Sequence, residues 1–551
     1  MRQALPAIVL IFFLPLLLLA QRPSKPRPIK GLPDRPKLVI GIVVDQMRYD
    51  FCQRYLGTYS EKGFKRLMQS GFSFSNCQYS YFPTITGPGH ASVFTGTTPW
   101  IHGIVGNNWF DKKTGGFMYC TRDDSVQGIG SSETEALMSP KNMQSYSVAD
   151  QVKLSCGGKS FGISVKDRGA ILPAGHGADA AFWFEAKSGN FISSNWYHSL
   201  KGRLPSWLEK FNNQGIARSY RDSVWNLLKP AQSYSASTGD NKDYEKSILK
   251  GQDPVFPYAL SRDNSPGFEI VRRTPFGNSL TARLAKVLIE NEGLGLDEKT
   301  DFLSLSFSCT DIVGHDYGPN SMEVQDTYLR LDRDLGEFFD FMDARIGSEN
   351  YLVFLTADHG ILEVPEFLNE KRLPSQRFQG EVFLSGLKAY CRQIFGSDDI
   401  IKAFENLQIY LNEEEITRLN LERSSVCEKI VSYAQGQPMV FRAFAFSGQR
   451  PFPDAALLEK YEQGWFRGRS GDIQIVLPPG ILDSERKKGT SHGSPYSYDS
   501  HVPLLWMGWK VKQGETAELI HIEDIAPTLS HLLRIMEPNG CTGKARKIPI
   551  Q

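Results

Sequence analysis

The arrangement of apolar and polar residues predicts four buried strands, each followed by a polar or charged side chain. Leu38–Val44 and Tyr351–Thr356 are continuous apolar runs, which is typical of strands buried on both faces. Leu303–Phe307 alternates between apolar and polar residues, and Phe161–Val165 leads directly into Lys166. We expect these segments to belong to one sheet.

One long helix is predicted between two of these strands. Its apolar residues recur at spacings of 4, 3, 4, 3 and 4 and therefore share one face: Val324, Tyr328, Leu331, Leu335, Phe338 and Met342. The strand–helix–strand order implies parallel pairing, so the predicted fold class is α/β with a mostly parallel central sheet. In such sheets, ligands collect at the carboxyl ends of the strands.

Aspartates follow three of the predicted strands, at Asp45, Asp311 and Asp358. A single aspartate after a strand is commonly a turn or helix-cap residue. Here two of the three have a nearby histidine, which shifts the interpretation toward a metal site. Asp311 and His315 are four residues apart and would share a face on a helical turn. The adjacent pair Asp358-His359 could be directed inward by one sharp turn.

A further candidate ligand, His492, lies in the small-residue loop 489–494. Nitrogen and oxygen ligands without thiolate suit zinc, and suit manganese less well. Three aspartates and three histidines are enough for two metals with three protein ligands each. We expect the remaining histidines to be ordinary core or surface residues, including His102, His176, His198, His501, His521 and His531.

The candidate nucleophile is the hydroxyl of Thr86. Pro88 suits a first helical position and Gly96 suits a helix end, which predicts Thr86 just ahead of a short helix. A metal and the positive end of the helix dipole can help to ionise a hydroxyl there. Alternatively, Thr86 simply caps the helix, a common role for threonine. Thr84 is a rival nucleophile by proximity.

The N-terminal residues 1–20 indicate a secretory signal peptide. Arg2 precedes an apolar run that extends from Leu5 to Ala20. The alternative is an uncleaved membrane anchor, but this run contains two prolines and falls short of the roughly 20 residues that a span needs. Residues 21–36 are rich in proline and predict an extended linker. The expected location is periplasmic or secreted, with no membrane span after removal of the signal.

Composition narrows the class of protein without identifying it. The 551 residues include 62 Lys+Arg and 61 Asp+Glu, which argues against a dedicated nucleic-acid binder. A charged content of 22% with 12% aromatic residues excludes wholesale disorder. Eight cysteines in an exported chain permit disulfides, but the sequence does not say which cysteines would pair.

Taken together, these motifs resemble the alkaline phosphatase superfamily of two-metal phosphoryl and sulfuryl transfer enzymes. The resemblance covers most of residues 37–551. The motifs stand in the superfamily's order: Asp45, Thr86, Asp311-x-x-x-His315, Asp358-His359, His492 and the closing segment Ile522–Ser530. It implies one catalytic domain over residues 37–551, with a mostly parallel sheet sandwiched by helices. Insertions at about 170–290 and 361–488 are expected to roof the site.

The resemblance also implies two zinc ions per chain and a covalent phosphothreonine at Thr86. The two ligand sets would be Asp311, His315 and His492 for one metal, and Asp45, Asp358, His359 and the Thr86 oxygen for the other. Two such metals clamp the attacking and leaving oxygens of an in-line displacement. Phosphate would pass first to Thr86 and then to water.

Two branches of the superfamily do not fit the sequence. The sulfatase motif Cys/Ser-x-Pro-x-Arg is absent around Thr86 and at every cysteine. Cofactor-independent phosphoglycerate mutases are cytoplasmic, use manganese and use a serine nucleophile. The branches that remain are nucleotide pyrophosphatase-like diesterases and threonine-nucleophile monoesterases. Both resemble this chain in Thr-x-Pro-(Asn or Gly)-His and in Gly106-Asn107-Asn108.

Lys166 and Arg168 favour the monoesterase branch. If they alternate at a strand end, both side chains point the same way, and an ammonium with a guanidinium suits a dianionic phosphoryl group. The segment resembles the Lys-x-Arg element of PafA-type, phosphate-irrepressible alkaline phosphatases, which diesterase relatives lack. Alternatively, residues 166–168 form a solvated surface turn. By the same resemblance, Asn107 would donate a hydrogen bond to a phosphoryl oxygen.

These observations predict an exported, zinc-dependent alkaline phosphatase that hydrolyses small phosphate monoesters broadly. We expect the protein to be a monomer and not to bind nucleic acid. The alternatives are a secreted phosphodiesterase or nucleotide pyrophosphatase, and a non-catalytic phosphate-binding relative.

Overall fold

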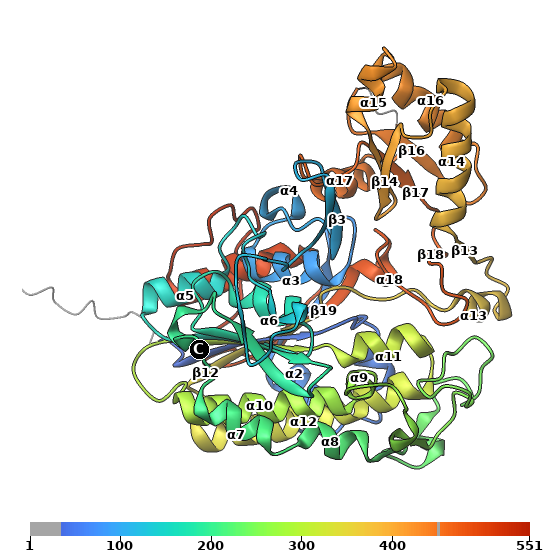
Figure 1. Cartoon of the computed structure of the whole chain (residues 1–551). Helices are drawn as coiled ribbons and strands as arrows, with labels where there is room; N and C mark the ends of the chain where they lie inside the picture. Colours follow the sequence, from blue (N-terminus) through green and yellow to red (C-terminus); the bar gives the residue numbers. More distant parts are fainter. Residues whose placement is uncertain (1–34, 449–451, 551) are drawn as a thin grey trace, which may run out of the picture. The chain divides into compact units, whose positions relative to one another are not determined.

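The computed structural model of the chain describes residues 35–448 and 452–550 (Figure 1). The predicted signal peptide, residues 1–20, and nearly all of the predicted linker lie outside the described residues. In the described part, none of the helices is both long enough and apolar enough to span a bilayer. All eight cysteines are described, and none forms a disulfide.

An eleven-stranded sheet forms the centre of the molecule. In spatial order its strands are β20 (Gly514–Thr516), β2 (Phe72–Gln78), β19 (His501–Gly508), β12 (Tyr351–Thr356), β1 (Leu38–Val44), β11 (Asp301–Phe307), β6 (Ser160–Ser164), β7 (Ala180–Glu185), β8 (Asn190–Ser194) and β5 (Gly128–Ile129), while β21 (Ile520–His521) pairs with β2. The run from β12 to β7 is entirely parallel. The predicted α/β class with a mostly parallel sheet is therefore confirmed.

The four predicted strands are neighbours within this parallel run. β1 and β12 have the predicted bounds, β11 begins two residues earlier, and β6 is shifted by one residue. Because the strands are parallel and adjacent, their carboxyl ends lie at the same edge of the sheet. The residues that follow them, including Asp45, Asp358 and Lys166, are thereby brought to one region.

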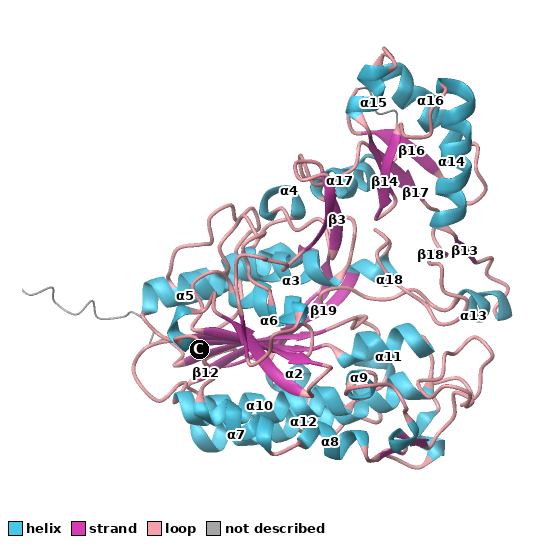
Figure 2. Cartoon of the chain, in the orientation of Figure 1, coloured by secondary structure: helices cyan, strands magenta, loops and turns pink. Residues whose placement is uncertain are grey.

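Helices cover both faces of the central sheet (Figure 2). One face carries α3 (Thr86–Thr95), α5 (Val148–Cys156) and α6 (Asp167–Ala174), and the other carries α7 (Ser206–Asn213), α10 (Phe276–Glu292) and α12 (Met322–Arg345). The predicted helix is α12, and every residue of its predicted apolar face is buried. At its start, the Ser321 hydroxyl caps the helix by accepting a hydrogen bond from the Val324 amide at 3.2 Å.

The two segments expected as insertions differ in architecture. Residues 170–290 contribute β7 and β8 to the central sheet and α10 to one of its covering layers, so much of this segment belongs to the main body. Residues 361–488 instead carry a sheet of their own, with α14 (Gly380–Phe395) and α16 (Arg423–Gln435) beside it and a separate apolar core. Its strands are β14 (Ile401–Glu405), β15 (Gln408–Leu411), β17 (Ile473–Val476) and β16 (Arg442–Ala445).

Candidate active site

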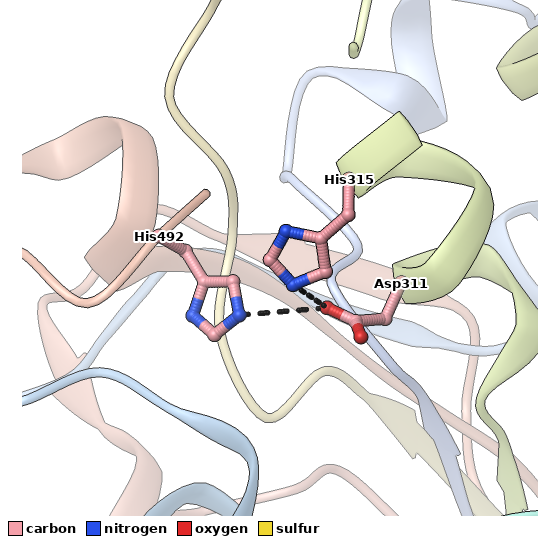
Figure 3. Close-up of side chains that lie close together, drawn as sticks. All are labelled: Asp311, His315 and His492. Carbon is pink, nitrogen blue, oxygen red and sulfur yellow. Dashed lines mark ion pairs between the residues drawn. The ribbon is translucent and has the colours of Figure 1, made fainter. Parts of the chain in front are cut away.

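The first group of candidate metal ligands joins a helix to a distant loop (Figure 3). Asp311 and His315 both lie on α11 (Cys309–Tyr317), one helical turn apart as predicted, and His315 Nε2 is 3.2 Å from Asp311 Oδ1. His492 comes from a loop, and its Nε2 lies 3.5 Å from the same oxygen. One ligand atom from each residue falls within 4.8 Å of the other two.

The second group of candidate ligands lies directly at the ends of two neighbouring strands. Asp45 follows β1, and Asp358-His359 follows β12. All three side chains are completely buried, and His359 Nε2 lies 3.5 Å from both Asp45 Oδ1 and Asp358 Oδ2. The rings of His359 and His492 stack with centroids 3.5 Å apart, so the two groups are adjacent.

Each of the three histidines forms a hydrogen bond from Nδ1 to a different backbone carbonyl. The distances are 2.8 Å from His315 to Thr490 O, 2.9 Å from His492 to Thr84 O, and 2.9 Å from His359 to Gly360 O. A carbonyl can only accept, so Nδ1 carries the proton and Nε2 presents its lone pair to the carboxylates. This is the arrangement usual for metal-binding histidines.

The second group has more buried negative charge than the protein satisfies. Within residues 35–448 and 452–550, Asp45 Oδ1 and Asp358 Oδ2 are buried without a hydrogen-bond partner. Burial, reinforced by the charge of Asp358, raises the pKa of Asp45 well above its usual range. Burial also lowers the pKa of His359 to about 3, which keeps its ring neutral. A neutral imidazole beside unpartnered carboxylate oxygens fits a divalent cation.

Lys166 lies between the two groups. Its Nζ is 2.8 Å from Asp45 Oδ2 and 2.6 Å from Asp311 Oδ2, so it bonds one carboxylate of each group. The side chain is 6% exposed, which excludes the solvated surface turn considered from the sequence. A buried ammonium in this position adds positive charge at the point where the groups meet.

Arg168 does not lie on a strand, so the prediction that it alternates with Lys166 at a strand end is wrong. β6 ends at Ser164, Lys166 is the N-cap of α6, and Arg168 falls in its first turn. Arg168 Nη1 donates to the Tyr119 hydroxyl at 2.9 Å, and that hydroxyl donates to Asp167 at 2.8 Å. Lys166 and Arg168 nevertheless line one cavity of about 370 Å³, together with Asp311 and His315.

Thr86 is the first residue of α3 rather than the residue ahead of it. The N-cap is Ile85, and no side chain caps the helix, so the capping role considered from the sequence is wrong. The buried Thr86 Oγ1 lies 3.4 Å from His359 Nε2. The helix ends at Gly96 with φ of 70°, as predicted. The rival hydroxyl of Thr84 instead donates to the Ser494 carbonyl at 2.7 Å.

Asn107 lies next to the start of α3. Its Oδ1 accepts a hydrogen bond from the Gly87 amide at 2.8 Å. This contact uses the amide oxygen and not the amide NH₂. The geometry is compatible with the predicted role of Asn107 as a donor beside Thr86.

Two buried residues of this region escaped the sequence analysis. His90 is one turn after Thr86 on α3, with Nδ1 2.9 Å from Thr86 O and 3.2 Å from Asp358 Oδ2. Gln46 donates from Nε2 to Asp311 at 2.6 Å and from its backbone to Asp358 at 3.1 Å. Both follow a predicted site residue closely, at i+4 and i+1, and that spacing is the signal that could have found them.

Comparison with known proteins places the chain in a family. Residues 39–499 match the family described as Type I phosphodiesterase / nucleotide pyrophosphatase. Alkaline phosphatase PafA from Elizabethkingia meningoseptica is 42% identical over 93% of this chain and 94% of its own length. A protein named calcium-transporting ATPase, from Myroides odoratus, is 41% identical over the same shares. The crystal structure of wild-type PafA matches with a TM-score of 0.90 at 41% identity, covering 95% of this chain and 100% of that one.

The chain belongs to the PafA-type alkaline phosphatases. The resemblance inferred from the sequence motifs is therefore confirmed, as is the alkaline-phosphatase-like fold. As a PafA-type alkaline phosphatase, the chain is a phosphoric monoester hydrolase. Relatives of this type imply metal ions, and the two Asp/His groups of this alkaline phosphatase are its candidate metal-binding residues.

Proposed function

We propose that this protein is an exported two-zinc alkaline phosphatase that hydrolyses phosphate monoesters broadly through a phosphothreonine at Thr86. The observation that carries the proposal is the position of Thr86, whose hydroxyl faces His359 beside two adjacent Asp/His groups. Export rests on the apolar N-terminal sequence alone. The monomeric state remains a prediction.

Two zinc ions would be held by the residues of the two groups. One set is Asp311, His315 and His492, and the other is Asp45, Asp358 and His359. Three nitrogen and oxygen ligands per metal leave a position open, as catalytic zinc requires. When bound, the metals supply positive charge for the attacking and leaving oxygens of an in-line displacement.

The reaction would proceed in two displacements at phosphorus. The Thr86 oxygen attacks the phosphoryl group as its proton passes to water, and the bond from phosphorus to the ester oxygen breaks as the alkoxide leaves and takes up a proton from water to become the alcohol. Water then attacks the phosphothreonine, the bond between phosphorus and the Thr86 oxygen breaks, and phosphate is released as Thr86 regains a proton. The amino end of α3 favours negative charge at Thr86 throughout.

Lys166, Arg168 and Asn107 would hold the non-bridging phosphoryl oxygens. A monoester presents three such oxygens and two negative charges, whereas a diester presents one charge and an additional substituent. The buried Lys166 ammonium and the Arg168 guanidinium line the same cavity and together suit the dianion. This contribution to binding favours monoesters over diesters.

The test compares p-nitrophenyl phosphate with bis(p-nitrophenyl) phosphate in the wild-type enzyme and in the double variant Lys166→Ala/Arg168→Ala. Charge-assisted hydrogen bonds contribute about 1.5–3 kcal/mol each, so we expect kcat/KM for the monoester to fall about 10²–10⁴-fold in the variant. Hydrolysis of the diester should fall far less. A wild-type preference for the diester, or equal losses for both substrates, would contradict the proposal.

A further inference from the structure

The cavity beside Asp311 and His315 carries more cationic than anionic side chains. Of the residues that line its volume of about 370 Å³, six are lysine or arginine and three are aspartate or glutamate. Two of the cations, Lys166 and Arg168, already have a role in the proposed phosphoryl site. The other four come from residues 246–273 and from Arg486, in the two segments expected to roof the site.

Three of these cations converge on the carboxylate of Asp316, which is 5% exposed and follows His315 on α11. Arg273 forms a hydrogen-bonded ion pair with it at 2.6 Å. Lys246 Nζ and Arg486 Nη1 lie 3.6 Å and 3.7 Å from its other oxygen. One carboxylate offsets one charge, so this Asp316 cluster (Lys246, Arg273 and Arg486 around Asp316) retains a surplus of two positive charges.

The surplus positive charge on the side chains of Lys246 and Arg486 is accessible to a ligand. Both side chains lie more than 3.5 Å from Asp316, too far for a hydrogen bond to it. Among residues 35–448 and 452–550, neither side chain donates a hydrogen bond to another protein acceptor. Their side chains are 51% and 47% exposed, while Arg273 is 22% exposed. Their donors are therefore accessible from the cavity, and Asp316 keeps the two charges close together.

The cluster lies on the side of the site from which a leaving group would depart. Thr86 approaches His359, in the group that contains Asp45 and Asp358. In-line displacement places the leaving oxygen opposite the attacking oxygen, which is toward Asp311 and His315. Both of those residues line the cavity that also contains the cluster. This assignment rests on the proposed function of Thr86 as nucleophile.

We propose that the Asp316 cluster is a subsite for an anionic group on the leaving alcohol. The substrates it would favour are phosphate monoesters whose alcohol carries a second negative group, a carboxylate or a phosphate, a few bonds from the ester oxygen. The first phosphoryl group binds at Thr86, Lys166 and Arg168, and the second anion contacts Lys246 and Arg486. The cluster thus selects among monoesters without taking part in phosphoryl transfer.

The test uses 3-phosphoglycerate and glycerol 3-phosphate, which both release a primary alcohol and differ in one carboxylate. We expect wild-type enzyme at low ionic strength to show a higher kcat/KM for 3-phosphoglycerate. In Arg486→Ala the ratio of the two kcat/KM values should fall about 3–10-fold, the size expected for a half-exposed charge pair. Arg486→Glu should lower the ratio further, and added salt should lower the wild-type ratio.

The matched control is Lys487→Ala, which removes a neighbouring exposed cation that does not line the cavity. It should leave the ratio unchanged. If Arg486→Ala and Lys487→Ala have the same effect, or if wild-type enzyme shows no preference for 3-phosphoglycerate, the subsite assignment is wrong. An enzyme that hydrolyses neither compound would instead overturn the proposed function. Equal melting temperatures of the variants would show that folding is unaffected.

Discussion

At the scale of single residues, the site depends on how the histidine rings are oriented. Each of His315, His359 and His492 gives its Nδ1 to a backbone carbonyl and turns Nε2 toward an aspartate. The loss of such a contact usually lowers the affinity for the metal by roughly 10–100-fold. Single contacts also separate the two candidate nucleophiles, Thr84 and Thr86, because of these two only the Thr86 hydroxyl faces a candidate metal group.

Thr86→Ala is expected to lower kcat for p-nitrophenyl phosphate by at least about 10³-fold, because it removes the oxygen that would receive the phosphoryl group. The matched control is Thr84→Ala, which loses one hydrogen bond to Ser494 and leaves the Thr84 carbonyl that holds His492. That variant should retain activity within about tenfold. Steady-state kinetics on both variants checks this, and the opposite ranking would assign the nucleophile to Thr84.

The sequence identified the residues that the structure brings into one region, but not the contacts that position them. Asp45, Asp311 and Asp358 were predictable because each follows a strand of unmistakable pattern. The spacing of His90 and Gln46 from Thr86 and Asp45 marks them as candidates, but their contacts with Asp358 and Asp311 were not predictable because those partners lie on other elements. A residue that acts through a tertiary contact leaves no periodic signal in the sequence.

At the scale of elements, α3 lies very close to Asp358, which follows β12. A Cβ added at Gly89 would lie 2.7 Å from the Asp358 Cβ and would also overlap the Asp358 carbonyl oxygen. The glycine therefore permits the helix that carries Thr86 to approach the residues that follow β12. This close packing also explains how His90, the next residue on α3, reaches Asp358.

Gly89→Ala is expected to destabilise the protein by about 1–3 kcal/mol, because the backbone must move to admit the methyl group. It should also lower kcat, since the movement separates Thr86 from His359. Gly57→Ala is the control, because a Cβ there meets nothing within 4 Å. Thermal unfolding and kinetics of the two variants test this; similar stability for both would show that the approach of α3 is not tight.

Element boundaries were less predictable than the elements themselves. β1 and β12 follow from their apolar runs, whereas the sequence placed Thr86 outside its helix and Arg168 on a strand. Both errors occur within two residues of a strand end or a helix start, where hydrophobic periodicity stops carrying information. The inclusion of β7 and β8 in the main sheet depends on long-range pairing that local pattern does not show.

At the scale of the whole molecule, one sheet edge concentrates charge in a chain with a net charge of only +1. Asp45, Asp311 and Asp358 are buried together with Lys166, whose ammonium bonds Asp45 and Asp311. Burying carboxylates is costly unless opposite charge is supplied. We therefore expect bound metal to stabilise the fold as well as to support activity.

Removal of metal by a chelator should abolish phosphatase activity and lower the melting temperature, and added zinc should restore both. A metal present at a thousandfold excess over its Kd contributes about 4 kcal/mol to the free energy of unfolding. Elemental analysis of the untreated enzyme should find two zinc ions per chain. Full activity in protein shown to contain no metal would contradict the proposed roles of both groups.

The most direct test of Thr86 as the nucleophile is a search for the phosphothreonine itself. Wild-type enzyme is mixed with p-nitrophenyl phosphate, quenched in acid during turnover, digested and analysed by mass spectrometry. We expect a phosphate adduct on Thr86 that disappears in Thr86→Ala. Turnover at the full wild-type rate with no adduct on any peptide, or an adduct on another residue, would contradict it.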